Sequence, residues 1–173
     1  MNILLTYSSK TGNTKKVAEG LNQIMPKDIT DFMPINKVES IDKYDCIFVG
    51  YWVDKALPND EAKVFMESIK NKKVGVFATL GAYPDSPHGR ESLENGVNIL
   101  NSNNNEVICE FICQGKIDER LVEMFKSFPE GHPHYVTEEK LKRYEIAAKH
   151  PDENDIEKAK EIFEKGMKEN GIK

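Results

Sequence analysis

The architecture of this chain follows from the stretch Ile3-Leu4-Leu5-Thr6-Tyr7-Ser8-Ser9-Lys10-Thr11-Gly12-Asn13-Thr14. Its first residues form a short apolar run, which is typical of a buried parallel strand. Hydroxyl side chains and a single glycine follow the run, and a segment with apolar residues at helical spacing comes next. The pattern therefore predicts a strand, a polar loop and a helix in succession.

The polar loop has the chemistry of a phosphate-binding site. Ser9, Thr11 and Thr14 offer hydroxyls, Gly12 offers backbone freedom, and the first helical turn from Asn13 offers free N–H groups. These donors suit a small anion, and a phosphate monoester is the obvious candidate. With one glycine, the loop matches neither G-x-x-x-x-G-K-[ST] nor G-x-G-x-x-G. The alternative is a polar turn that binds no ligand.

The spacing Ser9-x-Thr11-Gly12-x-Thr14 after a first strand resembles the [ST]-x-[ST]-G-x-T phosphate loop of the flavodoxins. In that family the loop wraps the ribityl phosphate of FMN with backbone N–H and hydroxyl groups. The resemblance implies FMN as the cofactor, with these residues around its phosphate: Ser9, Lys10, Thr11, Gly12, Asn13 and Thr14.

Strand-like and helix-like segments alternate along the chain, which predicts a parallel sheet with helices on both faces. After the strand from Ile3, we expect strands at 28–33, 44–50, 73–79 and 107–114, with helices between them. The predicted fold class is α/β, a flavodoxin-like doubly wound five-stranded parallel sheet with an additional C-terminal helical segment.

Residues 1–173 are expected to form one domain, in which 128–173 is a helical C-terminal extension. Helices are predicted at 137–149 and 151–170, and one of them should be the last helix that covers the sheet. The loop before them contains His132 and His134. No third ligand at convincing spacing accompanies these histidines, so a plain loop is favoured over a metal site.

Ligands of doubly wound sheets bind outside the carboxyl ends of the strands. Three loops with suitable chemistry follow predicted strands, at residues 8–14, 50–57 and 79–89. In flavodoxins the loops after the third and fourth strands hold the isoalloxazine ring, commonly with an aromatic residue. By this resemblance the ring contacts are Tyr51, Trp52, Thr79, Leu80, Gly81 and Tyr83. Packing of Trp52 against protein instead of flavin is the alternative.

Composition excludes several classes of protein. The formal net charge of −5 and the pI near 5.5 argue against a nucleic-acid partner, and an acidic surface suits basic protein partners. No apolar run approaches the roughly 18 residues of a membrane span, and no basic signal region precedes the first strand. A cytoplasmic location without membrane contact is therefore expected.

The three cysteines fit a reducing compartment. Cys109 and Cys113 share one predicted strand, where four residues separate them by roughly 13 Å, too far for a disulfide. Because no C-x-x-C spacing occurs, these residues and Cys46 are predicted to be core thiols.

The sequence contains no recognisable catalytic set, so any chemistry would belong to a bound flavin. A phosphoacceptor receiver domain has the same sheet topology, but it needs acidic residues after the first strand and an aspartate at the end of the third. Tyr7-Ser8 and Val49-Gly50 occupy those places here, which disfavours a receiver.

The resemblance favours an electron carrier that passes electrons between a reductase and a protein acceptor. The alternative is an FMN-dependent NAD(P)H/quinone-type oxidoreductase or a flavin-bearing accessory subunit of a reductase, for example of a tetrapyrrole such as bilirubin. The loop Trp52-Val53-Asp54-Lys55 supports the alternative, since carrier flavodoxins usually have an acidic, Gly-rich loop there, and Lys55 could reach the ring. A flavin-free interaction module is a third reading, and the oligomeric state stays open.

Overall fold

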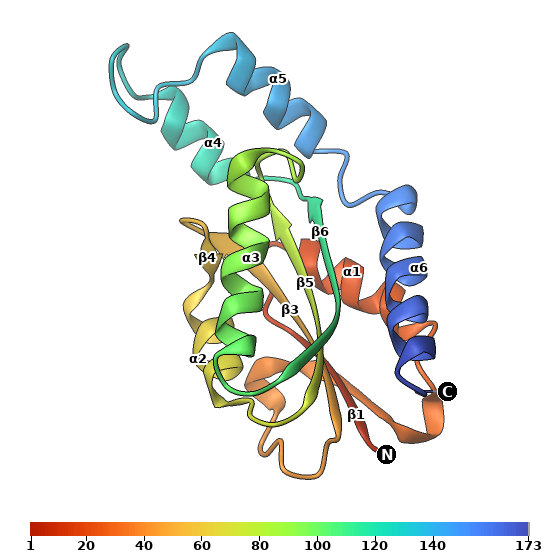
Figure 1. Cartoon of the computed structure of the whole chain (residues 1–173). Coiled ribbons are helices and arrows are strands. Elements are labelled where there is room, and N and C mark those ends of the chain that lie inside the picture. The colour runs from red at the N-terminus through yellow and green to blue at the C-terminus, as the bar shows by residue number, and fades with distance from the viewer. Residues whose placement is uncertain (173) are drawn as a thin grey trace.

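The computed structural model describes residues 1–172 and places a parallel sheet between two layers of helices (Figure 1). The sheet has the strand order β2-β1-β3-β5-β6, which is doubly wound with its switch point between β1 and β3. This order confirms the predicted α/β fold class. The parallel strands are β1 (Ile3–Tyr7), β2 (Thr30–Pro34), β3 (Cys46–Asp54), β5 (Lys73–Leu80) and β6 (Glu106–Gln114).

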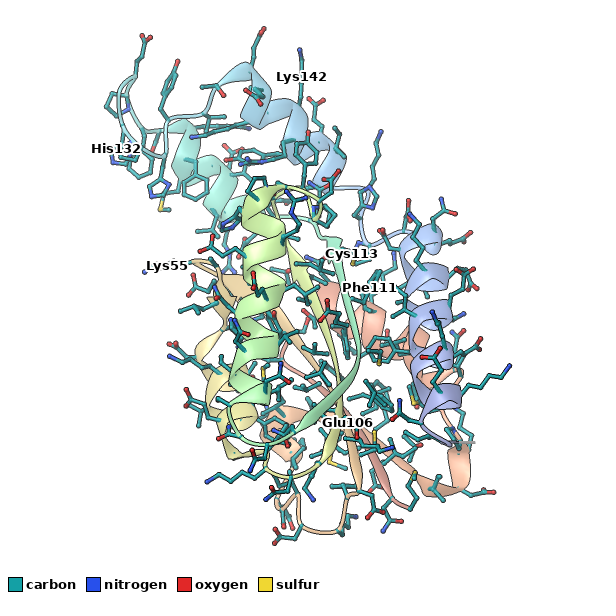
Figure 2. The ribbon with its side chains drawn as sticks, viewed as in Figure 1. Lys55, Glu106, Phe111, Cys113, His132 and Lys142 are labelled. Carbon is teal, nitrogen blue, oxygen red and sulfur yellow. The ribbon has the colours of Figure 1, made fainter. Side chains whose placement is uncertain are left out.

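Two helices cover each face of the sheet (Figure 1). One face carries α1 (Asn13–Asn22) and α6 (Glu153–Glu169), and the other carries α2 (Asp60–Ser68) and α3 (Pro87–Asn101). On the α6 side, Figure 2 shows Phe111 and Cys113 of β6 directed toward that helix. The final covering helix is therefore α6, the second of the two helices expected near the C-terminus.

The third strand is longer than the sequence predicted. The predicted strand ended at Gly50, whereas β3 continues to Asp54 because Trp52 remains paired with Thr79 of β5. A tight turn then returns the chain as β4 (Leu57–Pro58), which is antiparallel to β3. Figure 2 places Lys55 at the tip of this β3–β4 hairpin.

A third pair of helices lies beyond the sheet (Figure 1). α4 (Glu119–Lys126) was not predicted, and α5 (Glu138–Ala147) is the first of the two expected C-terminal helices. Leu121, Val122, Met124 and Phe125 recur at helical spacing in α4, so a sequence signal for this helix was present, although none of its side chains is buried. Figure 2 shows His132 at the far end of the loop that joins α4 to α5, where its ring stacks on Phe128 at 4.0 Å.

The three cysteines are free and buried, as the sequence predicted. Burial raises the pKa of Cys46 to about 12 and also raises the pKa of Cys109 and Cys113. Because the thiolate is the reactive form, these side chains serve the core rather than a redox reaction.

A cluster of metal-ligand types at the start of α6 is explained by helix capping. His150, Asp152 and Asp155 bring three potential ligand atoms within 4.8 Å of one another. Asp152 and Asp155 form a reciprocal capping box, and His150 Nδ1 lies 2.5 Å from Asp155 Oδ2. The carboxylates thus satisfy backbone N–H groups at the start of α6.

None of the helices within residues 1–172 combines the length and apolar character needed to cross a membrane.

Candidate functional site

A cavity of about 190 Å³ opens at the carboxyl ends of β1, β3, β5 and β6. Parallel strands bring their carboxyl ends to the same edge of a sheet, so loops that are distant in sequence meet there. The lining consists of Lys10, Thr11, Asn13, Trp52, Val53, Asp54, Thr79, Leu80, Gly81, Gly115, Lys116, Ile117, Asp118 and Leu121. Seven of these residues were predicted to bind the cofactor: Lys10, Thr11, Asn13, Trp52, Thr79, Leu80 and Gly81.

The loop before α1 turns its backbone donors toward a single oxygen. The N–H groups of Gly12 and Lys15 both donate to Ser9 Oγ, each at 3.2 Å. Gly12 is the N-cap of α1 and has φ of +97°, a conformation that suits glycine because it lacks a Cβ. The first N–H groups of α1 lie next to this point, so the loop can present several donors to an anion.

Two side-chain contacts join this loop to the other strand ends. Thr14 is buried, and its Oγ1 shares a hydrogen bond of 2.9 Å with Thr79 Oγ1 at the end of β5. Asn13 Nδ2 donates to Thr11 Oγ1 at 3.2 Å and to the Lys116 carbonyl at 2.8 Å. The hydroxyl of Thr14 therefore braces the floor of the cavity, while Asn13 ties the loop to the segment after β6.

A partly buried hydrogen-bonded cluster fixes the start of the loop against α2. Ser8 Oγ donates to Glu61 Oε2 at 2.5 Å and accepts from Asn59 Nδ2 at 2.8 Å. The Ser8 N–H also donates to the Gly50 carbonyl at 2.9 Å. Because Ser8 is bound on three sides, the residues that follow it begin from a fixed position.

Trp52 lines the cavity with a half-buried ring, and a lysine from the first loop lies over it. The Nζ atom of Lys10 is 5.4 Å from the centroid of the Trp52 ring, a distance typical of a cation–π contact. The aromatic residue predicted after the third strand thus faces the cavity from the end of β3.

Two predicted aromatic contacts lie elsewhere. Tyr51 is fully buried on the opposite face of β3, and its hydroxyl donates to the Ser92 carbonyl of α3 at 2.8 Å. Its side chain therefore cannot stack on a ring in the cavity, because side chains alternate along a strand and Tyr51 precedes Trp52. A contact from the Tyr51 backbone stays a prediction. Tyr83 is 37% exposed and is outside the cavity lining, since its loop turns into α3 through the Ser86 cap.

The loop after β6 also lines the cavity, which the sequence pattern did not predict. Gly115, Lys116, Ile117 and Asp118 line the cavity directly beyond Gln114, the last residue of β6. Ligands of doubly wound sheets bind outside the carboxyl ends of the strands, and β6 is the fifth parallel strand. Its position in the sequence could therefore have identified the loop after it as part of the site. The side chain of Ile117 also packs where a Cβ on Gly81 would lie, which explains the glycine there.

Charged groups at the cavity are partly neutralised by neighbours on α4. Lys116 Nζ lies 2.5 Å from Glu119 Oε1, and Asp118 Oδ2 lies 2.8 Å from Arg120. Hydrogen bonds from the Arg120 side chain and backbone lower the pKa of Asp118, which keeps this carboxyl ionised. The paired lining groups therefore contribute little net charge.

Comparison with known proteins agrees with this geometry. The model of the flavodoxin domain family matches residues 4–164. The chain is 35% identical to the flavodoxin-like domain-containing protein BilS of Clostridioides difficile strain CD3 over 175 positions, which cover 96% of each chain. This chain therefore belongs to the flavodoxin domain family.

Solved structures share the fold at lower identity. Oxidised flavodoxin 1 from Bacillus cereus superposes with a TM-score of 0.62 at 16% identity, covering 97% of this chain and 98% of that one. A mutant flavodoxin of Fusobacterium nucleatum bound to flavin mononucleotide has a TM-score of 0.60 at 13% identity, with 97% and 96% covered.

Proposed function

We propose that this protein is a cytoplasmic FMN-binding electron carrier that receives electrons from a reductase and passes them to a protein acceptor. The observation that carries the proposal is one cavity with two chemically different ends. Thr11 and Asn13 bring the loop before α1 to one end of the lining, and the Gly12 and Lys15 N–H donors lie in the same loop and helix start, outside the lining itself. The Trp52 ring and the segments after β5 and β6 line the other end. FMN has the matching pair of groups, a phosphate and a flat conjugated ring.

The residues present fit this cofactor. The Gly12 and Lys15 N–H groups already share one oxygen acceptor, and the same donors can serve a phosphate oxygen. Trp52 offers an aromatic surface to the ring. Bound FMN would supply the transfer of electrons one or two at a time, and the protein would supply binding and electrostatics.

The position of the cavity suits a carrier. It opens at the carboxyl edge of the sheet, so a flavin ring beside Trp52 would lie near the protein surface. Electrons would then leave through the open edge of the ring to a protein that docks over it.

One observation favours the alternative of an enzyme. A groove of about 350 Å³ lies between α4 and α5, and it shares Lys116 and Ile117 with the cavity. Val122, Leu141 and Tyr144 give it an apolar lining. A small substrate in this groove would lie beside the flavin, which is the arrangement that an FMN-dependent oxidoreductase or a flavin-bearing reductase subunit needs.

Two assays distinguish these functions. With FMN, NADPH, a flavodoxin reductase and cytochrome c, we expect cytochrome reduction whose rate rises with the concentration of this protein. FMN-loaded protein should not oxidise NADH or NADPH when the reductase is left out. Oxidation of NAD(P)H without the reductase, coupled to quinone reduction, would instead support the enzyme. A protein that stays colourless after incubation with FMN would support a flavin-free interaction module.

Trp52 should report FMN binding directly, because it is the only tryptophan in the chain and it lines the cavity. We expect addition of FMN to quench most of the tryptophan emission, measured with excitation at 295 nm and corrected for flavin absorbance. Free N-acetyltryptophanamide at the same FMN concentrations is the control. Unchanged emission at saturating FMN would mean that Trp52 is not next to the ring.

A further inference from the structure

We propose that Lys10 sets the relative affinity of this protein for oxidised and reduced FMN, because its ammonium group lies over Trp52, at the end of the cavity where the flavin ring would bind. The inference rests on the proposed FMN binding and names the residue that tunes it. Lys10 belongs to the phosphate loop by sequence, but the structure separates its charge from the donors of that loop.

The position of Lys10 Nζ supports this role. The loop donors gather around Ser9 Oγ, whereas Lys10 extends across the cavity to lie 5.4 Å from the centroid of the Trp52 ring. A ring that packs next to Trp52 would therefore lie within Coulombic reach of this ammonium group. Lys55, which the sequence suggested for such a role, lies at the tip of the β3–β4 hairpin and is outside the lining (Figure 2).

Lys10 is also the cavity lysine whose charge is not balanced by a salt bridge. Lys116 is paired with Glu119, and Asp118 is held by Arg120. None of the ion pairs within residues 1–172 involves Lys10, whose Nζ lies over an aromatic ring. Its charge also makes a small contribution to the lowered pKa of Asp118, after the larger effect of Arg120.

Asp54 is the other carboxylate in the cavity lining, and its negative charge offsets the positive charge of Lys10 only weakly. It is exposed at the end of β3, where water screens its charge. Lys10 is exposed as well, so its effect on the ring is that of a partly screened charge and not of a buried one.

Reduction of FMN adds a negative charge to the flavin ring, and this charge attracts the Lys10 ammonium group. Two electrons and one proton convert FMN into FMNH⁻, whose additional negative charge lies on the pyrimidine part of the ring. The electrons come from the donor, which is the reductase in the proposed function and dithionite in the test below, and the proton comes from solvent. An ammonium group about 6 Å from this charge, in a partly solvated site, favours the reduced form by about tenfold in affinity.

The test measures the dissociation constants of oxidised FMN and of dithionite-reduced FMN under anaerobic conditions. Lys10→Met keeps the apolar stem against Trp52 and removes the charge, and Lys10→Arg keeps the charge over the ring. We expect Lys10→Met to raise the ratio of the reduced to the oxidised constant about tenfold, and Lys10→Arg to restore the wild-type ratio. Lys55→Met is the matched control and should leave the ratio unchanged.

The possible results separate the two proposals. An unchanged ratio in Lys10→Met, or an equal change in Lys55→Met, would overturn the role of Lys10. If both constants rise by the same factor, Lys10 acts on the phosphate or on loop structure, so its proposed role fails while FMN binding stands. If the wild-type protein binds FMN in neither oxidation state, the proposed function fails and the inference falls with it.

Discussion

FMN is expected to bind this protein at least about 100-fold more tightly than riboflavin, because riboflavin lacks the phosphate that the loop before α1 can bind. The N–H groups of Gly12 and Lys15 point to one position, and the free N–H groups of the first α1 turn adjoin it. Each hydrogen bond to a charged group contributes about 1.5–3 kcal/mol, so two of them account for a factor of about 100 or more. Isothermal titration calorimetry with both flavins measures the difference.

A hydroxyl variant separates phosphate binding from ring binding. Thr11→Ala should weaken FMN by about tenfold and leave riboflavin unaffected, since Thr11 lies in the loop at the edge of the cavity. Thr137→Ala is the matched control, because it removes the N-cap hydroxyl of α5, outside the cavity lining. Equal affinities of the wild-type protein for FMN and riboflavin would remove the assignment of the phosphate loop.

Phe163→Ala is expected to lower the free energy of unfolding by about 3–5 kcal/mol, the usual cost of removing a large buried aromatic side chain. Phe163 of α6 is 0% exposed, and its ring lies 5.4 Å from that of Phe48 and 6.0 Å from that of Phe77. The substitution leaves a cavity between α6 and the central strands. Urea unfolding followed by far-UV circular dichroism gives the free energy, provided the transition is two-state.

The neighbouring residue supplies the control for this experiment. Ile162 lies on the same helix but is 38% exposed, so Ile162→Ala should change stability by no more than about 0.5 kcal/mol. If the two substitutions cost the same, α6 does not cover the sheet as described. A large difference between them would establish that this C-terminal helix is part of the core and not an appended segment.

Several features of the fold could be read from local sequence because local chemistry specifies them. The apolar run from Ile3, the polar loop with Gly12 and the amphipathic helix after it depend on side-chain period and backbone freedom over a few residues. The same holds for α6, whose buried Ala159 and Phe163 recur at helical spacing. The alternation of such elements was sufficient to predict the doubly wound sheet.

The ring end of the site could not be predicted in the same way, because pairing between distant strands sets it. Continued pairing with β5 extends β3 past Gly50 and so places Tyr51 and Trp52 on opposite faces. Tyr51 then fits beneath α3 where Gly96 leaves space, since a Cβ there would lie 2.4 Å from the Tyr51 hydroxyl. The sequence shows that Tyr51 and Trp52 follow an apolar run, but not which of the two side chains faces the cavity.

The charge at the cavity likewise depends on contacts between segments that are far apart in the chain. Lys10 meets Trp52 across 42 positions of sequence, and Asn13 meets the carbonyl of Lys116 across 103. Local pattern identifies strands, helices and a loop with the donors of an anion site, because those depend on neighbours in sequence. Which lysine lies over Trp52, and which loops line the cavity, follow only when the sheet brings the carboxyl ends of its strands to one edge.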